Sequence, residues 1–183
     1  MRAALVLGLF LLSGCAFSAP APLFTGADAA YPFADGTRVE MTTSADERQL
    51  LTFTRAADGG YVLTGQNRDG ESESMPLLFV DVPETPEEDY IVQVHIDTDD
   101  NVVAFGFAWR MDGGALRIFS DPDAFDETAH VAQLDALCTR LTFGECQLDT
   151  REEVLAVARD LVAPHIIRSD ATLDDWIDLT PQN

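Results

Sequence analysis

Between Tyr31 and about Ser120, short apolar segments alternate with turn-forming residues. Segments of this length between turns are typical of β-strands. Two of the turns contain Asp-Gly-Gly, beginning at Asp58 and Asp112, where a tight hairpin needs positive φ. We therefore expect an antiparallel β-meander sheet of about seven strands. The strands are expected near residues 37–43, 47–55, 60–67, 75–82, 89–97, 102–110 and 115–120.

The segment Val102–Trp109 is apolar on both faces, which predicts a central strand covered on both sides. The C-terminal part of the chain supplies the cover. Thr150 and Glu153 form a capping box, and apolar residues follow at helical spacing.

The helix that begins there is expected over residues 151–163, because Ala163-Pro164 should end it. An earlier helix is expected over about 124–141, and a final helical turn or two from Thr172 to Leu179. The fold class predicted from these elements is α+β, with the meander sheet packed by C-terminal helices.

A weak internal repeat has a period of 54 residues. It pairs Phe53 with Phe107, and it pairs the two Asp-Gly-Gly turns with each other. A duplicated β-meander unit would produce this pattern. Two unrelated hairpins would produce it as well, because Asp-Gly is common hairpin chemistry.

The N-terminus has the organisation of an export signal. Arg2 supplies one positive charge, and the ten apolar residues Ala3–Leu12 follow. Ten helical residues rise roughly 15 Å, about half of a bilayer's hydrocarbon core, so the segment is too short to span a membrane. It ends in Leu12-Ser13-Gly14-Cys15, which resembles the lipobox of bacterial lipoproteins.

This resemblance implies that residues 1–14 are a signal peptide and that Cys15 is acylated as the first residue of the mature protein. Because Ala16 follows rather than Asp, it also implies the outer membrane, facing the periplasm, where the host has two membranes. The alternative is an ordinary signal peptide cut just after Cys15. We expect residues 15–30 to form a lipidated, flexible tether and residues 31–183 to form one domain.

The chain is strongly acidic, with a formal net charge of −21 at pH 7. Removing residues 1–14 removes one Arg and no acid, which makes the charge −22. A charge of this sign repels phosphate backbones, so we expect no nucleic acid as a partner. The sequence contains no Lys, and the Asp-rich surface indicates either a salty habitat or biased codon usage.

Two cysteines remain beyond Cys15. In an exported protein Cys138 and Cys146 are expected to form a disulfide, because two thiols at this spacing lack companions for a metal. The nearest histidines, His130 and His165, lie eight residues upstream of the first and nineteen downstream of the second.

No catalytic or cofactor motif is recognisable, and we expect no cofactor, no metal and no enzymatic activity. The histidines at 95, 130 and 165 are interpreted as structural. Asp97, Asp99 and Asn101 resemble the opening of a calcium loop. Val102 and Ala108 stand where that loop needs Gly and Glu, so a polar hairpin turn is the preferred interpretation and a weak cation site is the alternative.

Three functions remain compatible with these features. The first is a membrane-anchored envelope lipoprotein with a non-catalytic binding or scaffolding role and an envelope protein as its partner. The second is a carrier of a hydrophobic ligand or lipidated cargo, which requires a large apolar cavity. The third is a hydrolase, which requires a nucleophile, a base and an orienting group in one cleft.

Overall fold

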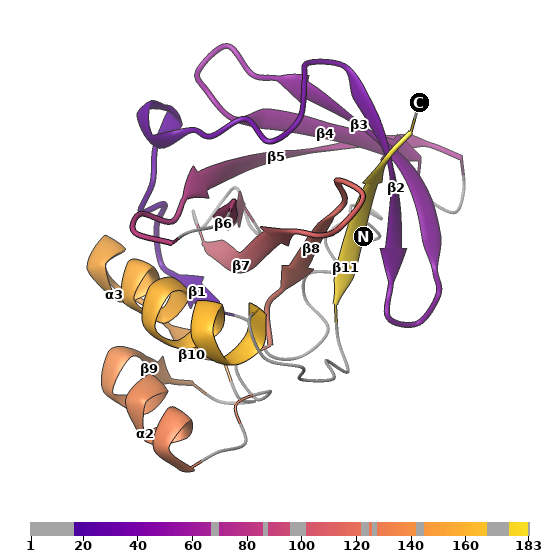
Figure 1. Cartoon of the computed structure of the whole chain (residues 1–183). Coiled ribbons are helices and arrows are strands. Elements are labelled where there is room, and N and C mark those ends of the chain that lie inside the picture. The colour runs from indigo at the N-terminus through magenta and orange to yellow at the C-terminus, as the bar shows by residue number, and fades with distance from the viewer. Residues whose placement is uncertain are drawn as a thin grey trace.

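The computed structural model describes residues 17–66, 70–85, 88–95, 102–121, 125, 128–141, 145–167 and 176–182. Eight strands form a closed antiparallel barrel (Figure 1). Strands β2 to β8 pair in succession, and β11 lies between β2 and β8. The bounds are β2 Thr37–Thr43, β3 Arg48–Arg55, β4 Tyr61–Gln66, β5 Ser72–Asp81, β6 Asp89–His95, β7 Val103–Arg110, β8 Leu116–Phe119 and β11 Ile177–Pro181.

The predicted positions of the seven strands are confirmed within a few residues over the described part of the chain. The predicted fold class is wrong. The sheet is not an open meander, and the protein is mostly β, with two short helices among the described residues. The prediction failed because closure depends on β11, which lies in the region where we expected a helical turn.

Strand β11 closes the barrel by pairing with a strand on each side. Ile177 lies opposite Thr43 of β2 and opposite Ile118 of β8. Ile177 and Leu179 are buried in the barrel, while Asp178 between them forms a two-bond ion pair with Arg117 of β8, at 2.7 and 2.8 Å. This alternation has the period of a strand rather than of a helix.

The barrel interior is filled by apolar side chains. Strand β7 contributes side chains to this interior from one face and to a second apolar cluster, outside the barrel, from the other. Its inward side chains are small, Ala104, Gly106 and Ala108. A Cβ at Gly106 would lie 2.8 Å from the Cγ2 atom of Ile118. The outward side chains are large and belong to a second core cluster outside the barrel. They are Val103, Phe105, Phe107 and Trp109.

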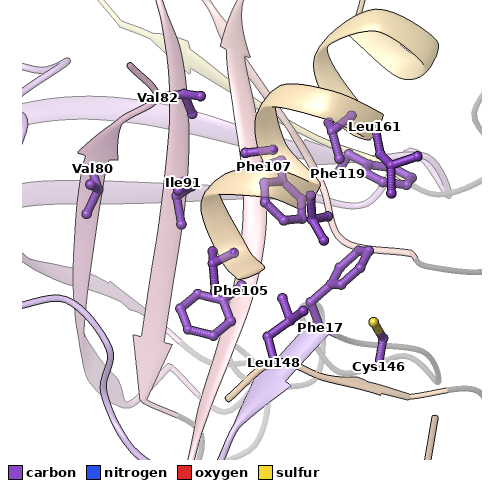
Figure 2. Packing of buried hydrophobic residues seen from close by; sticks show 14 of the residues in the cluster. Phe17, Val80, Val82, Ile91, Phe105, Phe107, Phe119, Cys146, Leu148 and Leu161 are labelled. Atoms are coloured by element: carbon purple, nitrogen blue, oxygen red, sulfur yellow. The ribbon is translucent and has the colours of Figure 1, made fainter. Parts of the chain in front are cut away.

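This second cluster is covered by a helix, as we predicted for the strand at 102–109. Helix α3 (Arg151–Ala156) begins at the Thr150 capping box and continues as the π-helix η4 (Val157–Ile167). Val154, Leu161 and Val162 are fully buried. Figure 2 shows Leu161 close to the outward aromatic side chains of the barrel wall.

The predicted end of this helix is wrong, because η4 runs through Pro164. Proline normally breaks an α-helix by clashing with the carbonyl four residues back and by lacking an N–H. The wider i→i+5 turn of a π-helix moves that carbonyl away from the ring. No helix formed by the described residues has the length and apolar character needed to cross a bilayer.

Three further strands extend the wall beside β7. Strand β1 (Phe17–Ala19) pairs with the N-terminal half of β7, and β8 pairs with the C-terminal half. β10 (Cys146–Gln147) is parallel to β1, and β9 (Thr139–Arg140) pairs with β10. Helix α2 (Thr128–Leu137) precedes β9, within the expected range 124–141.

The segment expected to be a flexible tether is folded onto the barrel from Phe17 onward. The ring of Phe17 lies edge-to-face against Phe107 at 5.1 Å, and Phe24 is also buried. A short 3₁₀ helix, η1 (Gly26–Asp28), follows. Small residues and prolines without periodicity suggested a linker, but the buried side chains of Phe17 and Phe24 hold the segment on the barrel.

The 54-residue repeat agrees with the structure in strand order and disagrees in side-chain direction. β2–β3–β4 and β6–β7–β8 are both three-stranded meanders. Phe53 points into the barrel, whereas the matching Phe107 points out toward the helix. Because a true duplication would keep equivalent side chains on the same face, the two unrelated Asp-Gly-Gly hairpins are the better explanation.

Candidate functional site

A groove of about 210 Å³ lies at the rim of the barrel, between the Phe24–Gly26 segment and the β3–β4 hairpin. Its floor is mainly apolar and comes from β4 and β5, while β6 contributes polar side chains. The lining residues are Phe24, Thr25, Gly26, Ala56, Asp58, Gly59, Tyr61, Pro76, Leu77, Leu78, Gln93 and His95.

Gln93 holds the Phe24 wall of the groove in place. Its side chain is 3% exposed and points out of the barrel from the middle of β6. The Oε1 atom accepts hydrogen bonds from the backbone N–H groups of Leu23 and Phe24, both at 3.0 Å. The Nε2 atom donates to the Phe24 carbonyl at 3.1 Å. One amide side chain thus satisfies three backbone groups of the loop.

The two walls meet where the loop touches the hairpin, and only glycine permits this contact. A Cβ on Gly26 would lie 1.7 Å from the carbonyl oxygen of Asp58. A Cβ on Gly59 would lie 2.5 Å from the Cα atom of Gly26, and Gly59 has a φ of +102°. The close backbone approach therefore fixes the width of the groove at this end.

A charged contact ties the same loop to helix α3. Arg151 forms an ion pair with Asp28 at 2.7 Å, and its guanidinium lies 4.8 Å from the centre of the Phe24 ring. Asp28 also accepts a hydrogen bond from the backbone N–H of Thr25. This backbone bond, followed by the bond from Arg151, lowers the pKa of the Asp28 carboxyl below its usual value.

Three titratable side chains line the groove. Its titratable side chains are Asp58, which is exposed on the hairpin, His95, which is half-buried at the end of β6, and Tyr61. Tyr61 points its hydroxyl at the carbonyl of Phe33, and burial raises its pKa. In the part of the chain that the structure describes, no three His, Cys, Asp or Glu side chains are grouped to hold a metal ion.

A second cavity lies inside the barrel and is much smaller, at about 30 Å³. It is lined only by apolar residues, among them Met41, Phe79 and Ile118. Its volume is close to that of one water molecule in the liquid. The barrel interior is therefore a packed core.

The predicted disulfide is confirmed, with the Cα atoms of Cys138 and Cys146 5.5 Å apart. It joins the end of α2 to β10. Cys15 lies outside the described residues, and so do Asp97, Asp99 and Asn101 of the possible cation turn.

The three histidines lie in two places. His95 borders the groove, whereas the rings of His130 and His165 stack between α2 and η4 with centroids 3.6 Å apart.

Sequence reasoning missed the groove altogether. The one signal of it in the sequence was Gln93, the single amide in an apolar strand. A buried amide needs hydrogen-bond partners, so Gln93 indicated that another segment covers β6 at this position.

Neither a family model, nor a curated protein, nor a solved structure matches this chain.

Proposed function

We propose that the chain is an envelope lipoprotein, acylated at Cys15, whose barrel domain binds a protein partner through the groove. The observation that carries the proposal is the contrast between the two cavities. The barrel interior is packed, whereas the groove outside it is open and has both polar and apolar lining residues. This arrangement favours binding at the surface over storage of a ligand within the barrel.

The size of the groove favours side chains of a protein over a free small molecule. A volume of about 210 Å³ corresponds to about seven water molecules and lies below the range of about 300–1,000 Å³ for typical ligand pockets. One or two side chains of a partner fit such a space. The apolar floor suits their stems, and the exposed carboxylate of Asp58 suits a positively charged end.

The overall charge supports a basic partner surface. With a formal net charge of −21, the chain attracts cationic surfaces over distances of about a Debye length. This attraction raises the rate at which a basic partner encounters the protein. A carrier of lipidated cargo is not favoured, because about 30 Å³ holds no acyl chain. A hydrolase is not favoured either, because the two hydroxyls in the lining are engaged elsewhere: Thr25 donates to Asp28 at 3.1 Å and Tyr61 donates to the carbonyl of Phe33.

Photocrosslinking in intact cells tests the binding role. A photoreactive residue in place of Ala57, which is exposed on the groove hairpin, should give a reproducible protein adduct. The substitution Asp58→Lys should abolish this adduct. Asp112→Lys is the matched control, because it reverses the same charge in the other Asp-Gly-Gly turn and should leave the adduct unchanged.

Equal loss of the adduct with both charge reversals would reject the groove as the binding site. Turnover of an ester, peptide or glycoside panel by the purified protein, abolished by His95→Ala, would reject a non-catalytic role. Acylation is tested separately by fatty-acid labelling in cells. The label should be lost in Cys15→Ala, and undiminished label would remove the anchor from the proposal.

A further inference from the structure

Very little chain separates the proposed anchor from the folded domain. Cys15 and the first strand residue, Phe17, are separated only by Ala16. Two fully extended residues reach at most about 7 Å. Phe17 is fully buried between Phe105 of β7 and Cys146 of β10, so β1 cannot detach to lengthen this connection without losing core contacts.

We propose that the lipid at Cys15 holds one defined flank of the barrel, α2 with the β9–β10 hairpin, against the bilayer surface. This inference rests on the acylation of Cys15 given under the proposed function. The surface that this flank contacts is the headgroup layer of a phospholipid bilayer.

The position of β1 places this flank next to the anchor. Phe17 pairs with Cys146, and neighbouring strands lie about 4.8 Å apart. The disulfide then brings Cys138, just after the end of α2, to within 5.5 Å of Cys146 between Cα atoms. Figure 2 shows Phe17, Leu148 and Cys146 close together beneath the helix.

The charge of the flank suits a lipid surface, unlike that of the remaining chain. From residue 128 to residue 147, which bound this flank, the Asp, Glu and Arg residues are Asp135, Arg140 and Glu145, and the first two form an ion pair at 2.8 Å. The net charge of the flank is therefore −1 in a chain of −21. A nearly neutral surface meets anionic headgroups with less repulsion than the remaining surface would suffer.

Several of the side chains exposed on the flank are small or apolar. On α2 they include Ala129, Ala132 and Ala136, and Leu141 follows β9 with 39% of its surface exposed. Such side chains allow close approach to headgroups, and the exposed charges of Asp135 and Arg140 are paired with each other.

The η1 turn, at one edge of the groove, is well separated from this flank. In Figure 1 the indigo turn of η1, which borders the groove, is far from α2 and the β9–β10 hairpin. With the α2 flank on the membrane, the η1 edge of the groove stands off the bilayer, where a partner can approach from the aqueous side.

The test uses the full chain, purified from membranes in its acylated form. It is reconstituted into vesicles of phosphatidylethanolamine and phosphatidylglycerol that contain a headgroup nitroxide lipid. A fluorophore is placed at Ala132→Cys on α2 or, as the matched control, at Ala57→Cys on the groove hairpin; both alanines are exposed. The disulfide and the acylated Cys15 do not react with the label.

The nitroxide should quench the probe at position 132 several-fold more strongly than the probe at position 57. A twelve-residue Gly/Ser spacer between Ala16 and Phe17, with a mean reach of about 20 Å, should reduce quenching at position 132 toward the value at 57. β1 and the barrel stay intact in this variant.

Equal quenching at the two positions in the unspaced protein, or no effect of the spacer, would overturn the proposed orientation. The acyl mass on Cys15, measured on the same samples, separates the two hypotheses. Protein without it overturns the anchor and the orientation together. Acylated protein with equal quenching overturns the orientation alone.

Discussion

Replacement of Gln93 by Ala should destabilise the groove wall more than any surface substitution. The substitution removes three hydrogen bonds to the backbone of Leu23 and Phe24. Phe24 is 2% exposed, so its N–H and C=O groups lose their partners in a nearly dry environment. We expect the loop to loosen while the barrel strands stay paired.

The magnitude follows from the number of groups left without partners. A buried unsatisfied polar group costs about 1–3 kcal/mol. Water entering from the adjoining groove offsets part of this for the half-buried Leu23 N–H. We therefore expect the free energy of unfolding to fall by about 2–4 kcal/mol, a large part of the typical total of about 5–15 kcal/mol. The melting temperature should fall by on the order of 10 °C.

Urea unfolding of the Cys15→Ala domain with its disulfide intact measures this change. Gln49→Ala is the matched control. The Nε2 atom of half-buried Gln49 donates to the carbonyl of Gln66, while its Oε1 atom has no partner among the described residues, so removing the side chain should change the free energy by less than about 0.5 kcal/mol. Amide exchange at Leu23 and Phe24 should accelerate only in the Gln93 variant. If the two variants unfold at the same urea concentration, Gln93 does not hold the loop and the reasoning is refuted.

Three further predictions concern the same region and its supports. Replacing both Cys138 and Cys146 by Ser should lower the free energy of unfolding by about 2.5 kcal/mol, because the closed loop is short; an unchanged urea midpoint would contradict this. Gly59→Ala should destabilise the domain more than Gly113→Ala, since both have positive φ but only Gly59 would place its Cβ against backbone; thermal melting of the two variants checks the difference. Asp28 has a lowered pKa when folded, so its stabilisation is present above the unfolded pKa and is lost as the pH falls through the folded pKa. Asp28→Asn should therefore lower stability at pH 7, by less than about 1 kcal/mol for this partly exposed pair, and much less at pH 3. An equal loss of stability in Asp28→Asn at pH 7 and pH 3 would contradict the lowered pKa of Asp28.

The strands from Thr37 to Phe119 were predictable because turn chemistry and short apolar segments coincide there. Barrel closure was not, because it depends on a contact between distant segments. In the sequence around β11, Leu173, Trp176 and Ile177 follow helical spacing, while Ile177 and Leu179 follow strand spacing. The local pattern is compatible with both periods. The segment forms a strand because β2 and β8 each have an edge whose backbone groups need a pairing partner.

The groove could not be predicted from the sequence for a different reason. Its walls come from residues near 25, 58 and 93, which no local pattern connects. The disulfide was predictable because the two cysteines lie close in sequence, in a chain whose N-terminus resembles an export signal. The position of β1 was not predictable, because Phe17 pairs with Phe105 and Cys146, which are distant from it in the sequence.

The closing role of β11 has a consequence for how the protein is made. Thr43 of β2 pairs with Ile177, so the two edges that seal the barrel are 134 residues apart in the chain. Synthesis proceeds from the N-terminus at about 5–20 residues per second, so β2 waits on the order of 10 s for its neighbour. During that interval the sheet has two open edges, and contacts at such long range form slowly in any case. The barrel thus stays open until β11 has been synthesised.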